Sequence, residues 1–346
     1  MKKILVALLA LVLALSMVGA FAEEVAEYDI RALIWKYDDT YGSSVRQAMN
    51  DAVEEINAEG NVKITLTMYD AADDMAKQVE QATMLVGEKP DFVIINLAEV
   101  ASGQQLVDMF TEAGIPFLFY NKEPSEETVQ SVIVDSGSIF IGTTPSEAGV
   151  MQGEILAELW EADPSIDLNG DGKLQFVEFE GEPNNPEAIA RTQYSESTAV
   201  EMGVPLEPAL DEYVIVANWD TAQAQEKMTP TWTATDGKVE VVFVNNDDMG
   251  TGVVAAMNAF GYNTGNEGDP SIVVIGVDAT DSALEAIKAG KMTATVKQDG
   301  DAMGYANVAI AVNYLQTGSW LEGTDYTYAE DGYSVRIPYA KITEVE

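Results

Sequence analysis

Short apolar segments alternate with longer amphipathic segments along most of this chain, and that alternation limits the fold more than any other feature of the sequence. Residues 91–97 are apolar almost throughout, as expected of a strand that is covered on both faces. From Val45 to Ile56, apolar residues recur at three-residue and four-residue spacing, which predicts a helix. Strands that alternate with helices form parallel sheets with helices on both sides. The strands predicted in the first half lie at 28–35, 62–69, 91–97 and 116–120.

A second series of the same kind follows, and 346 residues are enough for two domains of ordinary size. Thr144 and Glu147 match a capping box, which predicts a helix that runs to about residue 160. Another helix is predicted over residues 301–315. Further strands are predicted at 175–179, 213–217, 240–244, 272–277, 293–296 and 333–339. We therefore predict an α/β fold of two Rossmann-like domains, each with a mainly parallel sheet flanked by helices.

Polar or aromatic residues recur at or just after the ends of the predicted strands. These residues are Asp39, Tyr41, Asn121, Trp219, Asn246, Asp278 and Gln298. In an open parallel sheet, the carboxyl ends of the strands form the edge at which ligands bind. Carboxylates and amides pair with vicinal hydroxyl groups, and aromatic rings cover the C–H faces of a pyranose. The set favours a neutral polyhydroxylated ligand over a phosphate, because no glycine-rich phosphate loop opens a helix in this chain.

The segment 167–178 carries the pattern of a calcium-binding loop. Asp167, Asn169 and Asp171 place side-chain oxygens at every second residue, and a glycine follows at the sixth position. Lys173 can add its carbonyl and Gln175 its amide oxygen, while Glu178 holds the twelfth position. An EF-hand would continue as a helix, yet residues 174–180 alternate as in a strand, so Glu178 need not point at the ion. The alternative is an Asx-rich turn without a metal.

The segment 181–191 predicts the start of a helix. Asn185 is a favourable N-cap residue, and Pro186 suits the first helical position. Glu187 and Arg191 lie four residues apart and therefore share one face of that helix. They form either an ordinary surface ion pair or a polar fork at a cleft.

Composition excludes several classes of function. Cysteine and histidine are both absent, which removes disulfides, thiolate nucleophiles, the usual zinc ligands and the commonest general base. A net charge of −40 disfavours nucleic acids and anionic membrane surfaces as partners.

Residues 1–22 are expected to be a cleavable signal peptide. Lys2 and Lys3 precede the apolar stretch 4–18, and Ala20 and Ala22 supply the small residues of the cleavage site. No cysteine follows that could carry a lipid anchor, and no other segment is long and apolar enough to span a bilayer. The predicted location is therefore periplasmic or extracellular.

Several motifs together resemble those of the bacterial galactose/glucose-binding proteins of sugar ABC transporters, which are type I periplasmic binding proteins. The resemblance covers essentially the whole mature chain. Its most specific parts are K-Y-D-D at 36–39, Y-N-K-E-P at 120–124, D-L-N-G-D-G-K-L-Q-F at 167–176, G-E-P-N-N-P-E-A-I-A-R at 181–191, W-D-T-A-Q-A at 219–224, N-N-D at 245–247 and G-V-D at 276–278.

The resemblance implies two lobes joined by three hinge crossings, with a monosaccharide held between them. Residues 23–142 plus 299–334 would form the first lobe, and residues 143–298 plus 335–346 the second lobe with its calcium loop. The protein would be a monomer that delivers sugar to an ABC transporter permease, with a chemoreceptor as a further candidate partner. It would perform no reaction.

The resemblance also implies a role for each site residue. Asp39 and Asn121 would bind sugar hydroxyls from the first lobe, and Tyr41 and Trp219 would stack on opposite faces of the ring. The remaining hydroxyl contacts would come from Asn185, Glu187, Arg191, Asn246, Asp278 and Gln298. Calcium would be held by Asp167, Asn169, Asp171, the Lys173 carbonyl, Gln175 and Glu240, the last in place of a twelfth-position glutamate.

The chain departs from the family pattern at a few positions. Asn185-Pro186-Glu187 stands where His-Pro-Asp is usual, Tyr41 replaces a phenylalanine and Gln298 an asparagine. Glucose and/or galactose is the predicted ligand, and the preferred epimer stays open. One alternative is a secreted glycoside hydrolase that uses paired carboxylates such as Asp39 and Glu187. Another is a sugar-sensing module that serves a receptor rather than a transporter.

Overall fold

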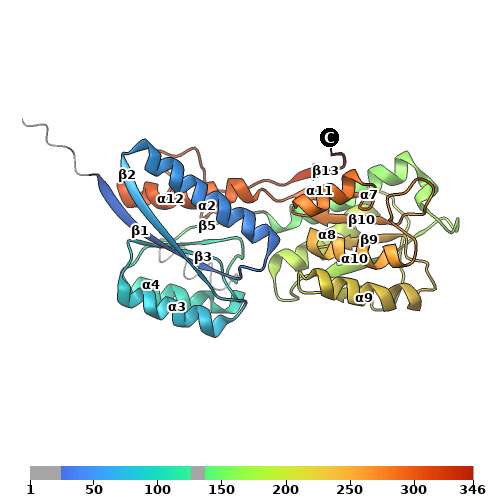
Figure 1. The fold of residues 1–346 in the computed structure, drawn as a ribbon, viewed down its shortest axis with the longest axis horizontal. Helices are drawn as coiled ribbons and strands as arrows, with labels where there is room; N and C mark the ends of the chain where they lie inside the picture. Colours follow the sequence, from blue (N-terminus) through green and yellow to red (C-terminus); the bar gives the residue numbers. More distant parts are fainter. Residues whose placement is uncertain (1–24, 126–136, 346) are drawn as a thin grey trace, which may run out of the picture.

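The computed structural model describes residues 25–125 and 137–345, which form two α/β lobes, each built on its own sheet. Figure 1 shows the two lobes side by side along the longest axis, with chain segments running between them. The expected signal peptide at 1–22 lies outside the described residues. No helix among those residues has both the length and the apolar character needed to cross a membrane.

The sheet of the first lobe has six strands in the order β12-β5-β4-β3-β1-β2. All of its strand pairs are parallel. Its strands are β1 (Ala26–Ile34), β2 (Val62–Asp70), β3 (Phe92–Ile95), β4 (Phe117–Tyr120), β5 (Phe140–Gly142) and β12 (Ser334–Arg336). Its helices are α2 (Thr40–Glu59), α3 (Met75–Glu88), η1 (Val100–Ser102), α4 (Gly103–Ala113) and α12 (Gly300–Thr317).

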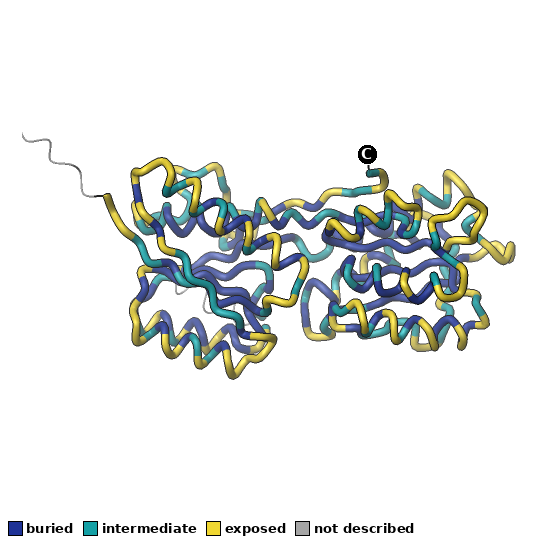
Figure 2. The backbone as a smooth tube through the Cα atoms, in the orientation of Figure 1, coloured by how far each residue is buried: buried dark blue, intermediate teal, exposed yellow. Residues whose placement is uncertain are grey.

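Strand β3 shows why this sheet needs cover on both faces. Phe92 and Ile94 pack into the apolar cluster under α2 and α12, whereas Val93 and Ile95 pack into the cluster under α3 and α4. Successive side chains of a strand point to opposite faces, so an all-apolar strand is buried only between two helical layers. Figure 2 shows these strands buried and the outer sides of the helices exposed.

The sheet of the second lobe has the order β13-β11-β10-β9-β6-β7, with β8 also paired to β6. Only β13 among its described strands runs antiparallel to its neighbour. Its strands are β6 (Leu174–Glu180), β7 (Leu206–Pro208), β8 (Val214–Val216), β9 (Val241–Val244), β10 (Val273–Val277), β11 (Ala294–Lys297) and β13 (Ala340–Ile342). Its helices are α7 (Pro145–Ala162), η3 (Pro164–Ile166), α8 (Pro186–Glu201), α9 (Thr221–Ala234), α10 (Asp247–Ala259) and α11 (Asp281–Lys288).

Within residues 25–125 and 137–345, the chain passes between the lobes three times, as the resemblance implied. The crossings connect β5 to α7, β11 to α12, and β12 to β13. The first and third crossings are joined by a backbone hydrogen bond of 2.7 Å from the Ile337 N–H to the Gly142 carbonyl. We refer to the residues between these paired elements as the hinge.

Three details of the predicted organisation are wrong. The strand predicted at 333–339 ends at Arg336 (β12), shortly before Pro338, which has no N–H to donate to a ladder. The next strand, β13, begins at Ala340 and belongs to the sheet of the second lobe. Since β12 pairs with β5 as far as Arg336, the predicted end of the first lobe at residue 334 falls inside that strand. The capping box at the start of α7 does not form either. Thr144 is the N-cap, but its side chain makes no capping hydrogen bond.

Candidate functional site

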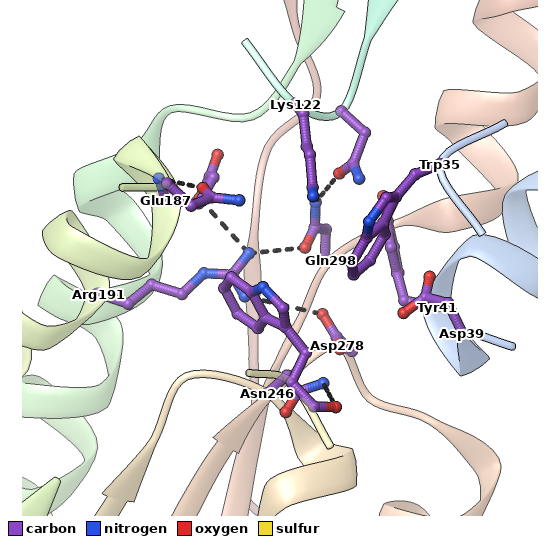
Figure 3. A pocket seen from close by; sticks show the side chains of 12 residues that line it. Trp35, Asp39, Tyr41, Lys122, Glu187, Arg191, Asn246, Asp278 and Gln298 are labelled. Atoms are coloured by element: carbon purple, nitrogen blue, oxygen red, sulfur yellow. Dashed lines mark hydrogen bonds and ion pairs between the residues drawn. The ribbon is translucent and has the colours of Figure 1, made fainter. Parts of the chain in front are cut away.

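A cavity of about 440 Å³, a volume that includes its opening to solvent, lies where the carboxyl ends of the strands of both lobes meet the hinge. Residues of both lobes and of the hinge line it (Figure 3): Trp35, Asp39, Tyr41, Asn121, Lys122, Asn185, Glu187, Arg191, Trp219, Asn246, Asp278 and Gln298. All ten sequence-predicted ligand contacts are therefore brought together, and two further residues join them.

Several of the polar lining residues also start helices. Asp39, Asn185 and Asn246 are the N-cap residues of α2, α8 and α10, and each accepts a hydrogen bond from a backbone N–H of its helix. In a parallel α/β fold, the helix that follows a strand begins at the carboxyl edge of the sheet. The capping hydrogen bonds therefore hold these side chains at the cavity wall without any contribution from a ligand.

Backbone strain is concentrated at the same edge. Asn121, Trp219 and Asp278 have positive φ angles of 62°, 63° and 118°. Asn and Asp enter this region more easily than other residues, but a bulky tryptophan there is an outlier. Strained residues of this kind cluster at ligand sites, where the surrounding structure imposes them.

Arg191 is the central cation of the site and is only 3% exposed. Its guanidinium donates to the Asn245 carbonyl at 2.7 Å, the Gln298 side-chain oxygen at 2.7 Å and the Tyr339 hydroxyl at 2.8 Å. It also lies 3.4 Å from Glu187 and 4.0 Å from Asp278. The predicted alternative of an ordinary surface ion pair for Glu187 and Arg191 is wrong, since both side chains are buried at the cavity.

The acidic residues of the cavity are strongly desolvated. Burial raises the pKa of Asp278 well above its usual range, and Arg191 only partly opposes that shift. Burial likewise raises the pKa of Asp39, although the Gly42 N–H and nearby cations act in the other direction. An additional negative charge inside this cavity would therefore be unfavourable.

Lys122 and Trp35 line the cavity but were not among the predicted contacts. Lys122 is 4% exposed, and its ammonium group donates to both oxygens of Glu182, each at 2.9 Å. The same ammonium group lies 3.6 Å from the centroid of the Trp35 ring (Figure 3). Burial lowers the pKa of Lys122, and the Glu182 carboxylate opposes that change. Because Lys122 belongs to the first lobe and Glu182 to the second, this ion pair spans the cleft.

The aromatic residues and two unpaired donors complete the wall. Tyr41 is buried, and its hydroxyl lies 3.4 Å from the sulfur of Met303. The ring of Trp219 lies directly against Gly181. Among the described residues, the Nε1–H of Trp219 and the Nε–H of Arg191 are buried without a hydrogen-bond acceptor. Donors in this state are costly unless a ligand or water supplies an oxygen.

The loop that follows η3 brings the predicted calcium ligands together. Asp167 accepts hydrogen bonds from the Gly170 and Gly172 N–H groups at 2.6 and 2.8 Å. Gln175 donates to Asp171 at 3.2 Å, and its side-chain oxygen accepts from Asn169 at 2.5 Å. These contacts join Asn169, Asp171 and Gln175 in one hydrogen-bonded group and tie Asp167 to the backbone of the same loop. Within the described part of the chain, no group of three or more His, Cys, Asp or Glu residues is close enough to hold a metal by itself.

The structure separates the two candidate glutamates of this loop. Glu240 accepts from the Leu168, Asn169 and Gln175 N–H groups at 2.6, 3.0 and 3.1 Å, so its carboxylate lies at the loop. Glu178 is fully buried and instead accepts from the Ser195 hydroxyl at 2.5 Å. The donor chemistry of carboxylates, amide oxygens and a carbonyl fits a hard cation such as Ca²⁺.

Comparison with known proteins identifies the family to which this chain belongs. Residues 32–319 match the family model described as a periplasmic binding protein domain. The chain belongs to the periplasmic binding protein family. Members of this family are solute-binding proteins. The D-galactose/methyl-galactoside binding periplasmic protein MglB of Haemophilus influenzae is 31% identical to it over 95% of this chain and 93% of that protein. A putative rhizopine-binding protein of Rhizobium meliloti is 27% identical over 94% of each chain.

Solved structures of periplasmic binding proteins share the fold. An ABC transporter solute-binding protein from Bacillus halodurans with bound myo-inositol superimposes with a TM-score of 0.72 at 25% identity, covering 93% of this chain and 96% of that one. A galactofuranose-binding protein gives a TM-score of 0.74 at 14% identity, covering 91% and 94%, which shows the fold alone. The resemblance that the sequence suggested is thereby confirmed for the family and its two-lobe architecture.

Proposed function

We propose that this periplasmic binding protein captures an uncharged monosaccharide, glucose and/or galactose, between its lobes and delivers it to an ABC transporter. The observation that carries the proposal is the composition of the cavity. Carboxylates, amides and one arginine from both lobes surround a space that is walled by Trp35, Tyr41 and Trp219. Hydroxyl groups can both donate to and accept from such a set, and the rings suit the C–H faces of a sugar.

The electrostatics of the cavity favour an uncharged ligand. Arg191 is already paired with Glu187 and Asp278, and Lys122 with Glu182. An anionic sugar would meet carboxylates whose pKa values burial has already raised. The galactoside named for MglB and the myo-inositol bound by the Bacillus protein are both uncharged and polyhydroxylated.

Contacts across the cleft support a closure mechanism. The Thr40 hydroxyl of α2 donates to the carboxylate of Asp248 on α10, whose two oxygens lie 3.0 and 2.8 Å from it. Gln298 donates to Asn121 at 3.3 Å, and the Lys122–Glu182 pair adds a third contact. A ligand that touches both lobes favours the arrangement in which these contacts form, because it gains interactions only there. The closed form is then the species that a permease recognises, and a chemoreceptor is a second candidate partner.

We also propose that the loop at 167–175 binds Ca²⁺ with Glu240 in a structural role. Asp167, Asn169, Asp171, the Lys173 carbonyl, Gln175 and Glu240 would hold the ion, which would supply charge compensation and rigidity to the second lobe. The mutual hydrogen bonds of Asn169, Gln175 and Asp171 would be exchanged for metal bonds. The export signal at 1–22 remains part of the same proposal, with a periplasmic or extracellular location.

A secreted glycoside hydrolase is a weaker alternative. Such an enzyme needs one carboxylic acid that can deliver a proton to the glycosidic oxygen. Both carboxylate oxygens of Glu187 already accept hydrogen bonds, from Thr143 at 2.5 Å and Tyr339 at 3.0 Å. This engagement does not suit a residue that must exchange a proton during turnover.

Titration calorimetry of the purified protein against glucose, galactose, ribose, xylose, myo-inositol and glucose-6-phosphate tests the proposal. We expect saturable 1:1 binding of an uncharged hexose and none of the phosphate. Tighter binding of the phosphate, or no binding of any hexose, would overturn it. An assay with aryl glucosides and galactosides addresses the alternative, because sustained turnover would identify an enzyme.

A further inference from the structure

Each hinge crossing contributes one side chain to the same buried pair, Glu187 and Arg191. Thr143 of the first crossing donates its hydroxyl to Glu187 at 2.5 Å. Gln298 of the second crossing accepts from Arg191 at 2.7 Å (Figure 3), and Tyr339 of the third accepts from Arg191 at 2.8 Å. Glu187 and Arg191 both line the cavity, whereas Thr143 and Tyr339 do not. The wall of the cavity and all three hinge segments therefore form one hydrogen-bonded unit.

Tyr339 holds the central position in this unit. Its buried hydroxyl oxygen accepts from Arg191 and lies 3.0 Å from both Thr143 Oγ1 and a Glu187 carboxylate oxygen. A phenol has one proton, so it donates to one of these two groups at a time. A single oxygen atom thus links the third crossing to the first crossing and to both members of the ion pair.

Thr143 is held from both lobes. Its carbonyl accepts from Arg336 of β12 at 2.7 Å, and Arg336 is fixed in turn by Glu123 through two bonds of 2.8 and 2.9 Å. Its hydroxyl is bound to Glu187 of the second lobe. A rotation of one lobe against the other changes the backbone at this residue and must stretch one of the two attachments.

We propose that Tyr339 and Thr143 are positioning residues that couple ligand contact by Arg191 and Glu187 to the angle of the hinge. The inference rests on the proposed sugar-binding function and adds residues that do not touch the ligand. When a ligand fixes the Arg191 guanidinium, the Tyr339 hydroxyl and the Thr143 side chain are fixed with it, which restrains the first and third crossings. Gln298 carries the same restraint to the second crossing and, through its bond to Asn121, to the first lobe.

Tyr339→Phe and Thr143→Val test the coupling, since each removes one hydroxyl and retains the shape of the side chain. Tyr213→Phe is the matched control. It also removes a hydroxyl bound to a carboxylate, that of Glu196 at 2.8 Å, but on the outer surface of the second lobe. Sugar affinity is measured by calorimetry. The distance between the lobes is measured by electron paramagnetic resonance between spin labels at Glu54→Cys on α2 and Ala255→Cys on α10. Both positions are exposed, and the chain contains no other cysteine.

We expect Tyr339→Phe and Thr143→Val each to weaken sugar binding by about five-fold or more, the lower end of usual coupling between sites. We also expect a broader distribution of label distances with sugar bound, and neither change in Tyr213→Phe. Affinity within about two-fold of wild type together with an unchanged distribution would overturn the inference, even if the melting temperature falls, because that result would leave the hydroxyls only a structural role. If wild type binds none of the sugars, the proposed function fails instead. In that case, the label distances measured without sugar test whether Tyr339 and Thr143 restrain the hinge. Distributions equal to that of wild type in both Tyr339→Phe and Thr143→Val would overturn that restraint.

Discussion

The packing of Trp219 against Gly181 gives the sharpest test of how the cavity is built. A Cβ atom added at Gly181 would lie 2.2, 2.3 and 2.5 Å from three atoms of the Trp219 ring, whereas ordinary contacts begin at 3.4 Å. In Gly181→Ala the ring must therefore move by about 1.2 Å, unless the backbone yields. Gly181 has no positive φ angle, so the substitution acts through this contact and not through backbone strain.

The expected loss of sugar affinity in Gly181→Ala depends on the direction in which the Trp219 ring is displaced. Trp219 lines the cavity, so displacement away from Gly181 relieves the clash in the free protein. A sugar that stacks on the ring must push it back and restore the clash. Overpacking of this kind costs about 1–3 kcal/mol, and that free energy is subtracted from binding. We expect sugar affinity to fall by roughly 5-fold to 150-fold, since each 1.4 kcal/mol is a factor of ten.

Calorimetry of Gly181→Ala measures its sugar affinity, and thermal unfolding measures its stability. Gly87→Ala is the control, because Gly87 lies within α3, and a Cβ there meets no atom within 4 Å. It should leave binding unchanged and stabilise the protein by about 0.5–1 kcal/mol. In a Trp219→Ala background, Gly181→Ala should leave the melting temperature unchanged, since the ring that it displaces is gone. Wild-type affinity in folded Gly181→Ala would refute the reasoning.

Three further predictions concern the ring, the loop and a buried acid. Trp219→Ala should abolish tight sugar binding without unfolding the protein, and unchanged affinity by calorimetry would exclude a stacking role. Chelation of Ca²⁺, or Asp171→Ala, should lower the melting temperature by several degrees, about 1–3 kcal/mol by mass action, so identical melting curves with and without chelator would remove the metal proposal. Burial raises the pKa of Asp247 from 3.8 to about 7, so the folded state binds its proton more tightly than the unfolded state does, and stability falls as the pH rises between those values. Asp247→Asn should flatten that fall in urea unfolding between pH 4 and pH 7, and an unaltered pH dependence would contradict the assignment.

The position of the site was predictable because the sheet topology brings the residues at the strand ends together. A parallel sheet places all its carboxyl-terminal strand ends at one edge, so residues such as Asn121 and Asp278, far apart in the sequence, meet once the strands are identified. Of the three helix caps in the cavity wall, only Asn185 was predicted; Asp39 and Asn246 are seen to cap α2 and α10 in the structure.

Contacts between the lobes could not be predicted in this way. Lys122 follows Asn121 directly, but a lysine in a loop is ordinarily solvated, and only the position of Glu182 in the other lobe shows that it is buried. Trp35 was read as the end of the first strand for the same reason, since the ammonium group on its ring comes from a distant segment. The strand predicted at 333–339 extended too far and β13 was not predicted, because the sequence does not reveal that the chain changes sheets at Pro338.

The Asn185-Pro186-Glu187 departure gains a physical meaning from these contacts. Asn185 caps α8 through its side-chain oxygen, which leaves its amide N–H₂ group to face Glu182 and the cavity. Glu187 uses its two oxygens to hold Thr143 and Tyr339, yet a carboxylate has about four acceptor sites, so it can accept a sugar hydroxyl at the same time. Glu187 thus contacts the first and third hinge crossings directly. Selection among epimers and adjustment of the hinge would then depend on the same carboxylate, so a ligand with a misplaced hydroxyl would be bound less tightly and would also close the lobes less completely.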